Sequence, residues 1–289
     1  MTFGNVVLSK NSMAGFVWKI SSEGTTLWAI GTSKSANGVV VDASSNVFIL
    51  QSMDSTWYNN IKKLSSSGAT LWEGVDIYGS GSETRLKGIS TDSTGNVVVA
   101  GYFGGTLTFG GIVKSAESSW CSTFNSGYGG VVWKLSSEGT TLWVNALQVS
   151  CNYRNYLSDV VVDNANGIVV TGRYDRLDSG TVRYARVWKL SSTGTLLWWT
   201  ARTDHYAYTT FVPRLRVHSD SILSLYPKYA ESVVWKLSTL GTTHYATGVS
   251  GQVSFALDDL GDAAAIGNGA TVIKVSRLVS YVFFFYTTI

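Results

Sequence analysis

An eleven-residue unit recurs along the chain, and this internal repeat constrains the fold more than any other feature. The first copy is Trp18-Lys19-Ile20-Ser21-Ser22-Glu23-Gly24-Thr25-Thr26-Leu27-Trp28. Further copies occupy residues 62–72, 133–143, 188–198 and 235–245, and a degenerate sixth copy occupies 273–283. The second position is always lysine: Lys19, Lys63, Lys134, Lys189, Lys236 and Lys274. Eight of the eleven tryptophans stand at the first or last position, so the repetition is not accidental.

A second unit alternates with the first and consists of two valine-rich runs separated by a short turn that begins with aspartate. It occurs at Asp42, Asp92, Asp163 and Asp258, and a worn copy places His218 at the aspartate position. Both units predict β-hairpins. Glycine in the Ser-Ser-x-Gly turn can adopt a positive φ, and the aspartate can accept hydrogen bonds from turn N–H groups.

Two hairpins per repeat make a four-stranded sheet, and a radial array of such sheets is a β-propeller. We therefore predict an all-β fold in which residues 1–289 form one propeller domain of six four-stranded blades. The sequence contains six lysine-bearing hairpins but only five hairpins of the second kind. We therefore expect a mixed closing blade built from Thr2–Leu8 and Val279–Tyr286. Five or seven blades stay open as alternatives.

The paired hairpins resemble the SBBP-type β-propeller repeat of bacterial surface and secreted proteins. The resemblance lies in Asp92-Ser93-Thr94-Gly95-Asn96, in the Lys-Leu-Ser-x-x-Gly of residues 134–139, and in the glycine-rich residues 101–111. Thr2-Phe3-Gly4-Asn5 repeats the Thr-Phe-Gly element of residues 108–110. The resemblance covers nearly the whole chain and implies the fold, but it implies no particular activity.

The spacing from Gly24 to Trp28 is similar to the tryptophan-docking motif of quinoprotein propellers. That resemblance implies that Trp28, Trp72, Trp143 and Trp198 pack between neighbouring blades. The calcium ligands and cofactor-binding residues of those enzymes have no counterpart here, so we expect no cofactor. The Asp box of sialidases is not matched, because glycine and tryptophan are four residues apart and no aspartate occupies the box.

The recurring lysine stands in a strand beside tryptophan and leucine, which is unusual for a charged residue. In one interpretation its stem covers apolar surface while its head reaches water. In the other it pairs with the aspartate of an adjacent hairpin turn, such as Asp42, Asp92 or Asp163. A catalytic role is disfavoured, because six equivalent positions do not make one active site.

Charge and cysteine content exclude several classes of protein. The net charge is +3 with no basic run, so we expect no nucleic-acid binding. There is no CxxC pair and the three histidines are isolated, so we expect no metal site. Residues 1–10 lack the pattern of a signal peptide, and the apolar segment Leu278–Ile289 is shorter than the ~20 residues of a membrane span.

The long insertions all belong to one end of the blades, so we expect ligand contacts there. The candidate ligand-binding residues are Tyr102, Trp120, Tyr128, Tyr153, Tyr156, Tyr174, Tyr206 and Tyr208. They suit sugar rings or a protein partner, but they could equally pack against one another to hold the loops. Cys121 and Cys151 fall on the same end, which makes a disulfide between them plausible in an oxidising compartment.

The sequence favours a binding module over an enzyme, because the common nucleophile, phosphate-loop and metalloprotease motifs are absent. We predict a non-enzymatic scaffold for adhesion, assembly or protein interaction, belonging to a larger assembly. The alternative is a glycan-binding lectin or glycan-active enzyme. We expect an extracellular or cell-surface location, or a place in a virion or filament.

Overall fold

A computed structural model of the chain describes residues 2–8, 14–53, 56–74, 77–79, 83–116, 128–147, 153–176, 182–202, 214–217, 221–228, 231–250, 254–257 and 263–266. The regular structure of these residues is entirely β, as the hairpin repeat predicts. Within the same ranges no helix is long and apolar enough to cross a membrane.

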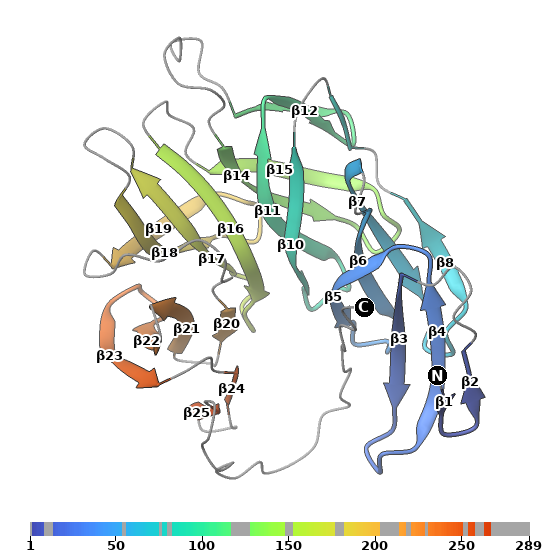
Figure 1. Ribbon diagram of the computed structural model, residues 1–289. Coiled ribbons are helices and arrows are strands. Elements are labelled where there is room, and N and C mark those ends of the chain that lie inside the picture. Colours follow the sequence, from blue (N-terminus) through green and yellow to red (C-terminus); the bar gives the residue numbers. More distant parts are fainter. Residues whose placement is uncertain are drawn as a thin grey trace.

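Four antiparallel sheets of four strands follow one another along the chain (Figure 1). The first blade contains β5 (Ser35–Val41), β6 (Val47–Met53), β7 (Thr56–Leu64) and β8 (Thr70–Glu73). The second contains β10 (Thr84–Thr91), β11 (Val97–Gly104), β14 (Tyr128–Leu135) and β15 (Thr141–Leu147). The third contains β16 (Tyr153–Val162), β17 (Ile168–Arg176), β18 (Val182–Leu190) and β19 (Leu196–Arg202). The fourth contains β20 (Arg214–Val217), β21 (Ser221–Lys228), β22 (Glu231–Ser238) and β23 (Thr243–Ser250).

The first strand of each blade faces the centre of the molecule. β10 contacts both β5 and β16, and β16 contacts β20, so these four strands stand side by side around one axis. Each blade then runs outward in chain order. This arrangement is a β-propeller, and it confirms the fold class that the repeat predicts.

Two half-blades accompany the four complete blades. β3 (Gly15–Ile20) and β4 (Thr26–Thr32) form a two-stranded sheet that carries the first copy of the lysine unit. β24 (Ser254–Leu257) and β25 (Ala263–Ile266) form another. Residues 267–289 lie outside the described part of the chain, including the expected closing segment Val279–Tyr286.

The segment Thr2–Leu8 is not a blade strand, which corrects our expectation. β1 (Thr2–Phe3) and β2 (Val6–Val7) form a separate hairpin, and the ring of Phe3 packs on Trp18 with centroids 5.2 Å apart. The second blade has an equivalent hairpin, β12 (Thr106–Phe109) and β13 (Ile112–Ser115), with β9 (Ile77–Gly79) alongside. There Phe109 packs on Trp133 at 5.5 Å. Burial of phenylalanine on the first tryptophan of the repeat therefore decides where both Thr-Phe-Gly elements lie.

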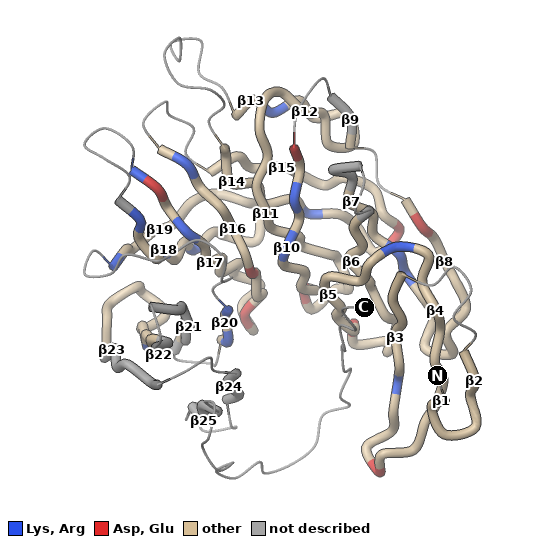
Figure 2. The backbone as a smooth tube through the Cα atoms, viewed as in Figure 1, with Lys and Arg blue, Asp and Glu red and all other residues tan. Residues whose placement is uncertain are grey.

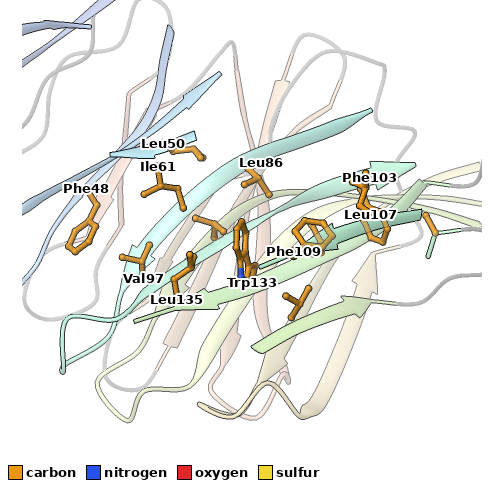
Figure 3. Close-up of a cluster of buried hydrophobic side chains, with 14 residues drawn as sticks. Phe48, Leu50, Ile61, Leu86, Val97, Phe103, Leu107, Phe109, Trp133 and Leu135 are labelled. Carbon is orange, nitrogen blue, oxygen red and sulfur yellow. The ribbon is translucent and has the colours of Figure 1, made fainter. Parts of the chain in front are cut away.

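The hydrophobic cores lie between blades and not within them. Val97 and Val99 of β11 belong to a cluster shared with the first blade, which contributes Phe48 and Leu50 (Figure 3). The intervening Val98 belongs to a cluster shared with the third blade. Successive strand residues point to opposite faces of a sheet. A continuous valine run in β11 therefore fills two cores at once.

The last tryptophan of the lysine unit also forms a hydrogen bond from each blade to the next. The indole N–H donates to a backbone carbonyl in the glycine-containing turn of the following blade's lysine unit, at Ser66, Ser137, Ser192 or Thr239. The four N–O distances are 2.9 Å from Trp28, 2.9 Å from Trp72, 3.2 Å from Trp143 and 3.2 Å from Trp198. We call this the docking contact. It confirms that these tryptophans pack between blades.

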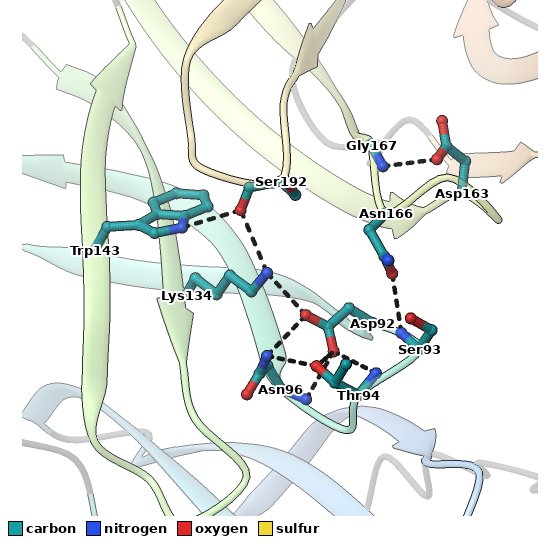
Figure 4. A network of polar contacts seen from close by, with 10 residues as sticks. All are labelled: Asp92, Ser93, Thr94, Asn96, Lys134, Trp143, Asp163, Asn166, Gly167 and Ser192. Atoms are coloured by element: carbon teal, nitrogen blue, oxygen red, sulfur yellow. Dashed lines mark hydrogen bonds and ion pairs between the residues drawn. The ribbon is translucent and has the colours of Figure 1, made fainter.

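The recurring lysine takes part in the same junction. Nζ of Lys134 donates to the Ser192 carbonyl at 3.3 Å and lies 2.8 Å from Oδ2 of Asp92 (Figure 4). Lys189 is likewise 3.0 Å from Asp163. The aspartate-pairing interpretation is confirmed at these two copies, where the side chains are largely buried. The idea that the lysine head reaches water is wrong there, because the neighbouring blade covers it.

Candidate functional site

Three of the predicted tyrosines meet where the second and third blades adjoin, at the end that carries the long insertions. Tyr102 lies near the end of β11, Tyr128 is the first residue of β14, and Tyr156 lies near the start of β16. Their ring centroids are 5.6, 4.9 and 5.3 Å apart. We call this group the first tyrosine cluster. It joins residues from two blades, and Tyr102 and Tyr156 are more than fifty positions apart in the sequence.

A second tyrosine cluster lies on the third blade. The rings of Tyr153 and Tyr174 stack with centroids 5.2 Å apart and an interplanar angle of 20°. Tyr184 continues the cluster at 5.8 Å from Tyr174, its direct partner in the β17–β18 register. Sequence reasoning missed Tyr184. Knowing the strand register would have identified it, because it stands opposite a predicted residue.

Arginines cover the tyrosine rings. The guanidinium carbon of Arg173 lies 4.2 Å from the Tyr156 centroid, and that of Arg154 lies 6.0 Å from the Tyr128 centroid. Arg186 lies between Tyr174 at 3.6 Å and Trp199 at 4.0 Å. Each contact places a cation on the negative face of an aromatic ring. The arginines were not among the predicted site residues.

Two carboxylates accompany these cations. Oε2 of Glu83 accepts a hydrogen bond from the Tyr128 hydroxyl at 2.9 Å, and Glu83 also pairs with Arg85. Burial together with Glu83 raises the pKa of Tyr128 to about 12, so its phenol stays protonated at neutral pH. Asp175 lies 2.8 Å from Nε of Arg173. Burial nevertheless raises the pKa of Asp175.

The cationic character continues onto the inner strands. Lys87 on β10 is half-buried, and burial followed by the charge of Arg85 lowers its pKa, with Arg214 of β20 contributing in the same direction. No carboxylate of the described residues forms an ion pair with Lys87. The acidic residue Asp159 of β16 contacts β20, where it accepts a hydrogen bond from the Leu215 N–H at 2.9 Å.

The fold therefore concentrates basic residues that the sequence disperses. Figure 2 shows Lys and Arg on β10, β16, β17 and β20, around the same part of the propeller. No basic run marks them in the sequence, since side chains that share one face of a strand are separated by residues of the opposite face. Basic residues two positions apart in a predicted strand, such as Arg85 and Lys87, are the sequence signal that could have identified this basic face.

The structure describes only some of the predicted ligand-binding residues. Tyr102, Tyr128, Tyr153, Tyr156 and Tyr174 come together as two clusters, and their rings pack on one another as the alternative interpretation proposed. Trp120, Tyr206 and Tyr208 lie outside the described residues, as do Cys121 and Cys151 of the expected disulfide. Across the described part of the chain, no three His, Cys, Asp or Glu residues gather closely enough to hold a metal ion.

Comparison with known proteins yields structural likenesses and no family. No family model matches the chain, and no curated protein matches its sequence. A Trypanosoma rangeli sialidase is 12% identical with a TM-score of 0.48, covering 88% of this chain and 46% of its own. A Bacteroides caccae protein of unknown function is 12% identical with a TM-score of 0.43, covering 72% of this chain and 61% of its own.

A Clostridium thermocellum α-L-arabinofuranosidase is 10% identical with a TM-score of 0.45, and the match covers 75% of each chain. The chain thus spans about half the length of the sialidase and 61% of the Bacteroides protein. Likenesses this distant carry no argument about activity. The fold assignment rests on the sheet order, and any functional inference has to come from the residues of the site.

Proposed function

We propose that this propeller is a binding module, without catalytic activity, that holds an acidic glycan at the two tyrosine clusters. The observation that carries the proposal is the combination of aromatic rings with an excess of cations. The clusters and the adjoining β10 contain six cations against the two acids Glu83 and Asp175. The cations are Arg85, Lys87, Arg154, Arg173, Arg183 and Arg186.

Each component of the site supports one part of the recognition. Tyrosine offers an apolar ring face for the pyranose and a hydroxyl for its polar edge. A guanidinium group matches a carboxylate or sulfate in bidentate geometry. Because the arginines are partly desolvated against the rings, their charge is screened less than that of an exposed side chain. A neutral glycan would gain the stacking but not the ion pairs, so the site favours acidic sugars.

The proposal includes a location outside the cell or at its surface, where acidic polysaccharides are exposed. A role as a scaffold in a larger assembly is compatible with it, since the glycan would be the anchoring ligand. The insertions at this end vary in length between blades, while the described connections at the opposite end are tight turns. Ligand contacts commonly gather on such loops above a rigid framework.

A second candidate function is cleavage of a glycosidic bond, and the Tyr128–Glu83 hydrogen bond favours it. A tyrosine within 2.9 Å of a carboxylate has the geometry of a nucleophile beside its base. The raised pKa of Tyr128, about 12, weighs against this function, because a nucleophilic tyrosine needs an accessible phenolate. Binding is therefore the better-supported function.

Binding can be measured by calorimetry with oligogalacturonate, a sulfated oligosaccharide and a neutral oligosaccharide of equal length. We expect the two acidic ligands to bind and the neutral one to bind at least ~10-fold more weakly, which corresponds to about 1.4 kcal/mol. Raising the salt concentration from 50 to 500 mM should weaken the acidic ligands selectively. Equal affinity for neutral and acidic ligands would contradict the proposal.

The variant Arg173→Ala removes the cation above Tyr156, and we expect it to lower the affinity for the acidic ligands by about 10- to 100-fold. Lys114→Ala is the matched control, since Lys114 lies on β13 outside both clusters and should leave affinity unchanged. Hydrolysis of an acidic oligosaccharide that disappears in Tyr128→Phe would replace binding by the second function.

A further inference from the structure

Four of the glycine-containing turns of the lysine unit are each covered by a tryptophan of the preceding blade. A Cβ atom added to the turn glycine would lie very close to the indole ring. The distances are 3.2 Å for Gly68 on Trp28, 3.4 Å for Gly139 on Trp72, and 2.9 Å for both Gly194 on Trp143 and Gly241 on Trp198. The absence of a side chain at these glycines is what lets the indole lie flat on the turn.

The turn of the first copy, Ser21–Gly24, differs in this respect. Gly24 has the same left-handed backbone, with φ of 80° against 86° for Gly194. No described atom outside its chain neighbours lies within 4 Å of its added Cβ. Within the described ranges the Ser22 carbonyl accepts no hydrogen bond from a tryptophan or lysine. The first turn therefore has the form of a docking site that no described blade occupies.

The half-blade that carries this turn is also incomplete at its inner edge. In the complete blades the third strand pairs with the second, as β14 pairs with β11. β3 is the third strand of its blade and pairs only with β4 among the described strands. Among the described strands, the other edge of β3 therefore has no hydrogen-bonding partner for its N–H and C=O groups.

The hairpin β24–β25 has the complementary deficiency. Its strands lie on either side of Asp258 in the sequence, and the repeat therefore makes β24 a first strand and β25 a second strand. Neither pairs with a third strand in the described part of the chain. Figure 1 shows the hairpin between the fourth blade and β3–β4 around the propeller. Apart from β3, β4, β24 and β25, every blade strand that the structure describes belongs to a four-stranded sheet.

We propose that β25 docks on the open edge of β3, so that β24, β25, β3 and β4 form the fifth blade and close a five-bladed ring. The register follows from the other blades. Ala263 pairs with Leu257 as Val97 pairs with Thr91, and Val97 in turn pairs with Leu135, the residue after the lysine. By equivalence Ala263 pairs with Ile20, Ala264 with Lys19, Ala265 with Trp18, and Ile266 with Val17.

Closure would complete two further features of the molecule. The fourth blade would precede the new blade, and its lysine unit ends with Tyr245 at the position of the docking tryptophan. That aromatic residue would then cover Gly24. β24 would lie next to β20 as an inner strand. It would extend the ring of inner strands that includes β20 with Arg214 and β10 with Lys87.

A designed disulfide tests the register directly. In a chain with Cys121→Ser and Cys151→Ser, the pair Val17→Cys and Ile266→Cys should oxidise to an intramolecular disulfide in the monomer, since paired strands bring Cα atoms into the bonding range. Val17→Cys with Ala265→Cys is the matched control. It is displaced by one residue, so its two side chains point to opposite faces and should stay reduced.

Three results would overturn the proposal. The first is no cross-link in a variant whose circular dichroism matches the parent chain. The second is cross-linking only between two molecules, which would make a second copy the occupant of β3. The third is efficient cross-linking of Ile266→Cys with Val272→Cys, which would assign β25 to the sixth copy of the lysine unit.

The glycine turns provide a test that needs no cysteine. If an aromatic side chain covers Gly24, the variant Gly24→Ala should lower Tm as much as Gly194→Ala does, because both add a methyl group beneath a ring. Without closure, Gly24→Ala would suffer only from its positive φ, and its loss of Tm would be clearly smaller. Differential scanning calorimetry of the two variants beside the parent chain distinguishes these results.

Discussion

Replacing Trp188 with alanine is expected to lower the free energy of unfolding by about 3–5 kcal/mol. Trp188 is 1% exposed and belongs to the core between the second and third blades, together with Val98 and Val170. Removing the indole leaves a cavity bounded by two separate sheets, which cannot collapse without shifting a whole blade. Urea unfolding followed by circular dichroism measures the change.

Trp199 provides the matched control, because it stands directly opposite Trp188 in the β18–β19 register. It is 51% exposed and touches the Arg186 guanidinium at 4.0 Å. Trp199→Ala should therefore cost about 1 kcal/mol, the value of a cation–π contact with little burial. Equal losses in the two variants would contradict the conclusion that stability resides in the cores between blades.

The second large effect is expected from Asp92→Asn, which should lower the free energy of unfolding by about 3–5 kcal/mol at neutral pH. The carboxylate lies 2.8 Å from Nζ of Lys134, and the two side chains are only 4% and 8% exposed. Neutralising Asp92 leaves a buried ammonium whose remaining partner is the Ser192 carbonyl. The junction between the second and third blades would lose its central ion pair.

This effect depends on pH in a direction that follows from the pKa of Asp92. Burial alone would raise the pKa, but hydrogen bonds from Lys134, Asn96 and Thr94 outweigh it and lower the pKa in the folded state. The stabilisation is therefore complete above the unfolded-state pKa of about 3.9 and is lost as the pH falls below it. We expect the difference between the parent chain and Asp92→Asn to shrink between pH 5 and pH 2, as urea midpoints would show.

Asp42→Asn is the matched control for this prediction. Asp42 begins the equivalent turn of the first blade and binds Asn46 just as Asp92 binds Asn96. No ion pair joins Asp42 to Lys63 among the described residues. Its substitution should cost clearly less than that of Asp92. A loss as large as that of Asp92→Asn would show that the turn hydrogen bonds, and not the lysine, carry the effect.

The sequence could predict what repeats. Glycine at a fixed position, lysine in each strand and tryptophan at both ends of the unit recur because every blade meets the next in the same way. Positive φ at Gly68, Gly139 and Gly241 was therefore predictable from one copy. The Thr-Phe-Gly element also repeats, although its packing on Trp18 and Trp133 was not expected.

The sequence by itself determined the all-β class, the twin hairpins and the tryptophan junction between blades, because each depends on residues close together in the chain or on exact repetition. Only the tertiary structure decided the candidate site. Tyr102 and Tyr156 meet across two blades, and Arg173 covers their cluster from a third strand. Contacts of this kind depend on strand register and on the angle between sheets, and no periodic signal in the sequence records either.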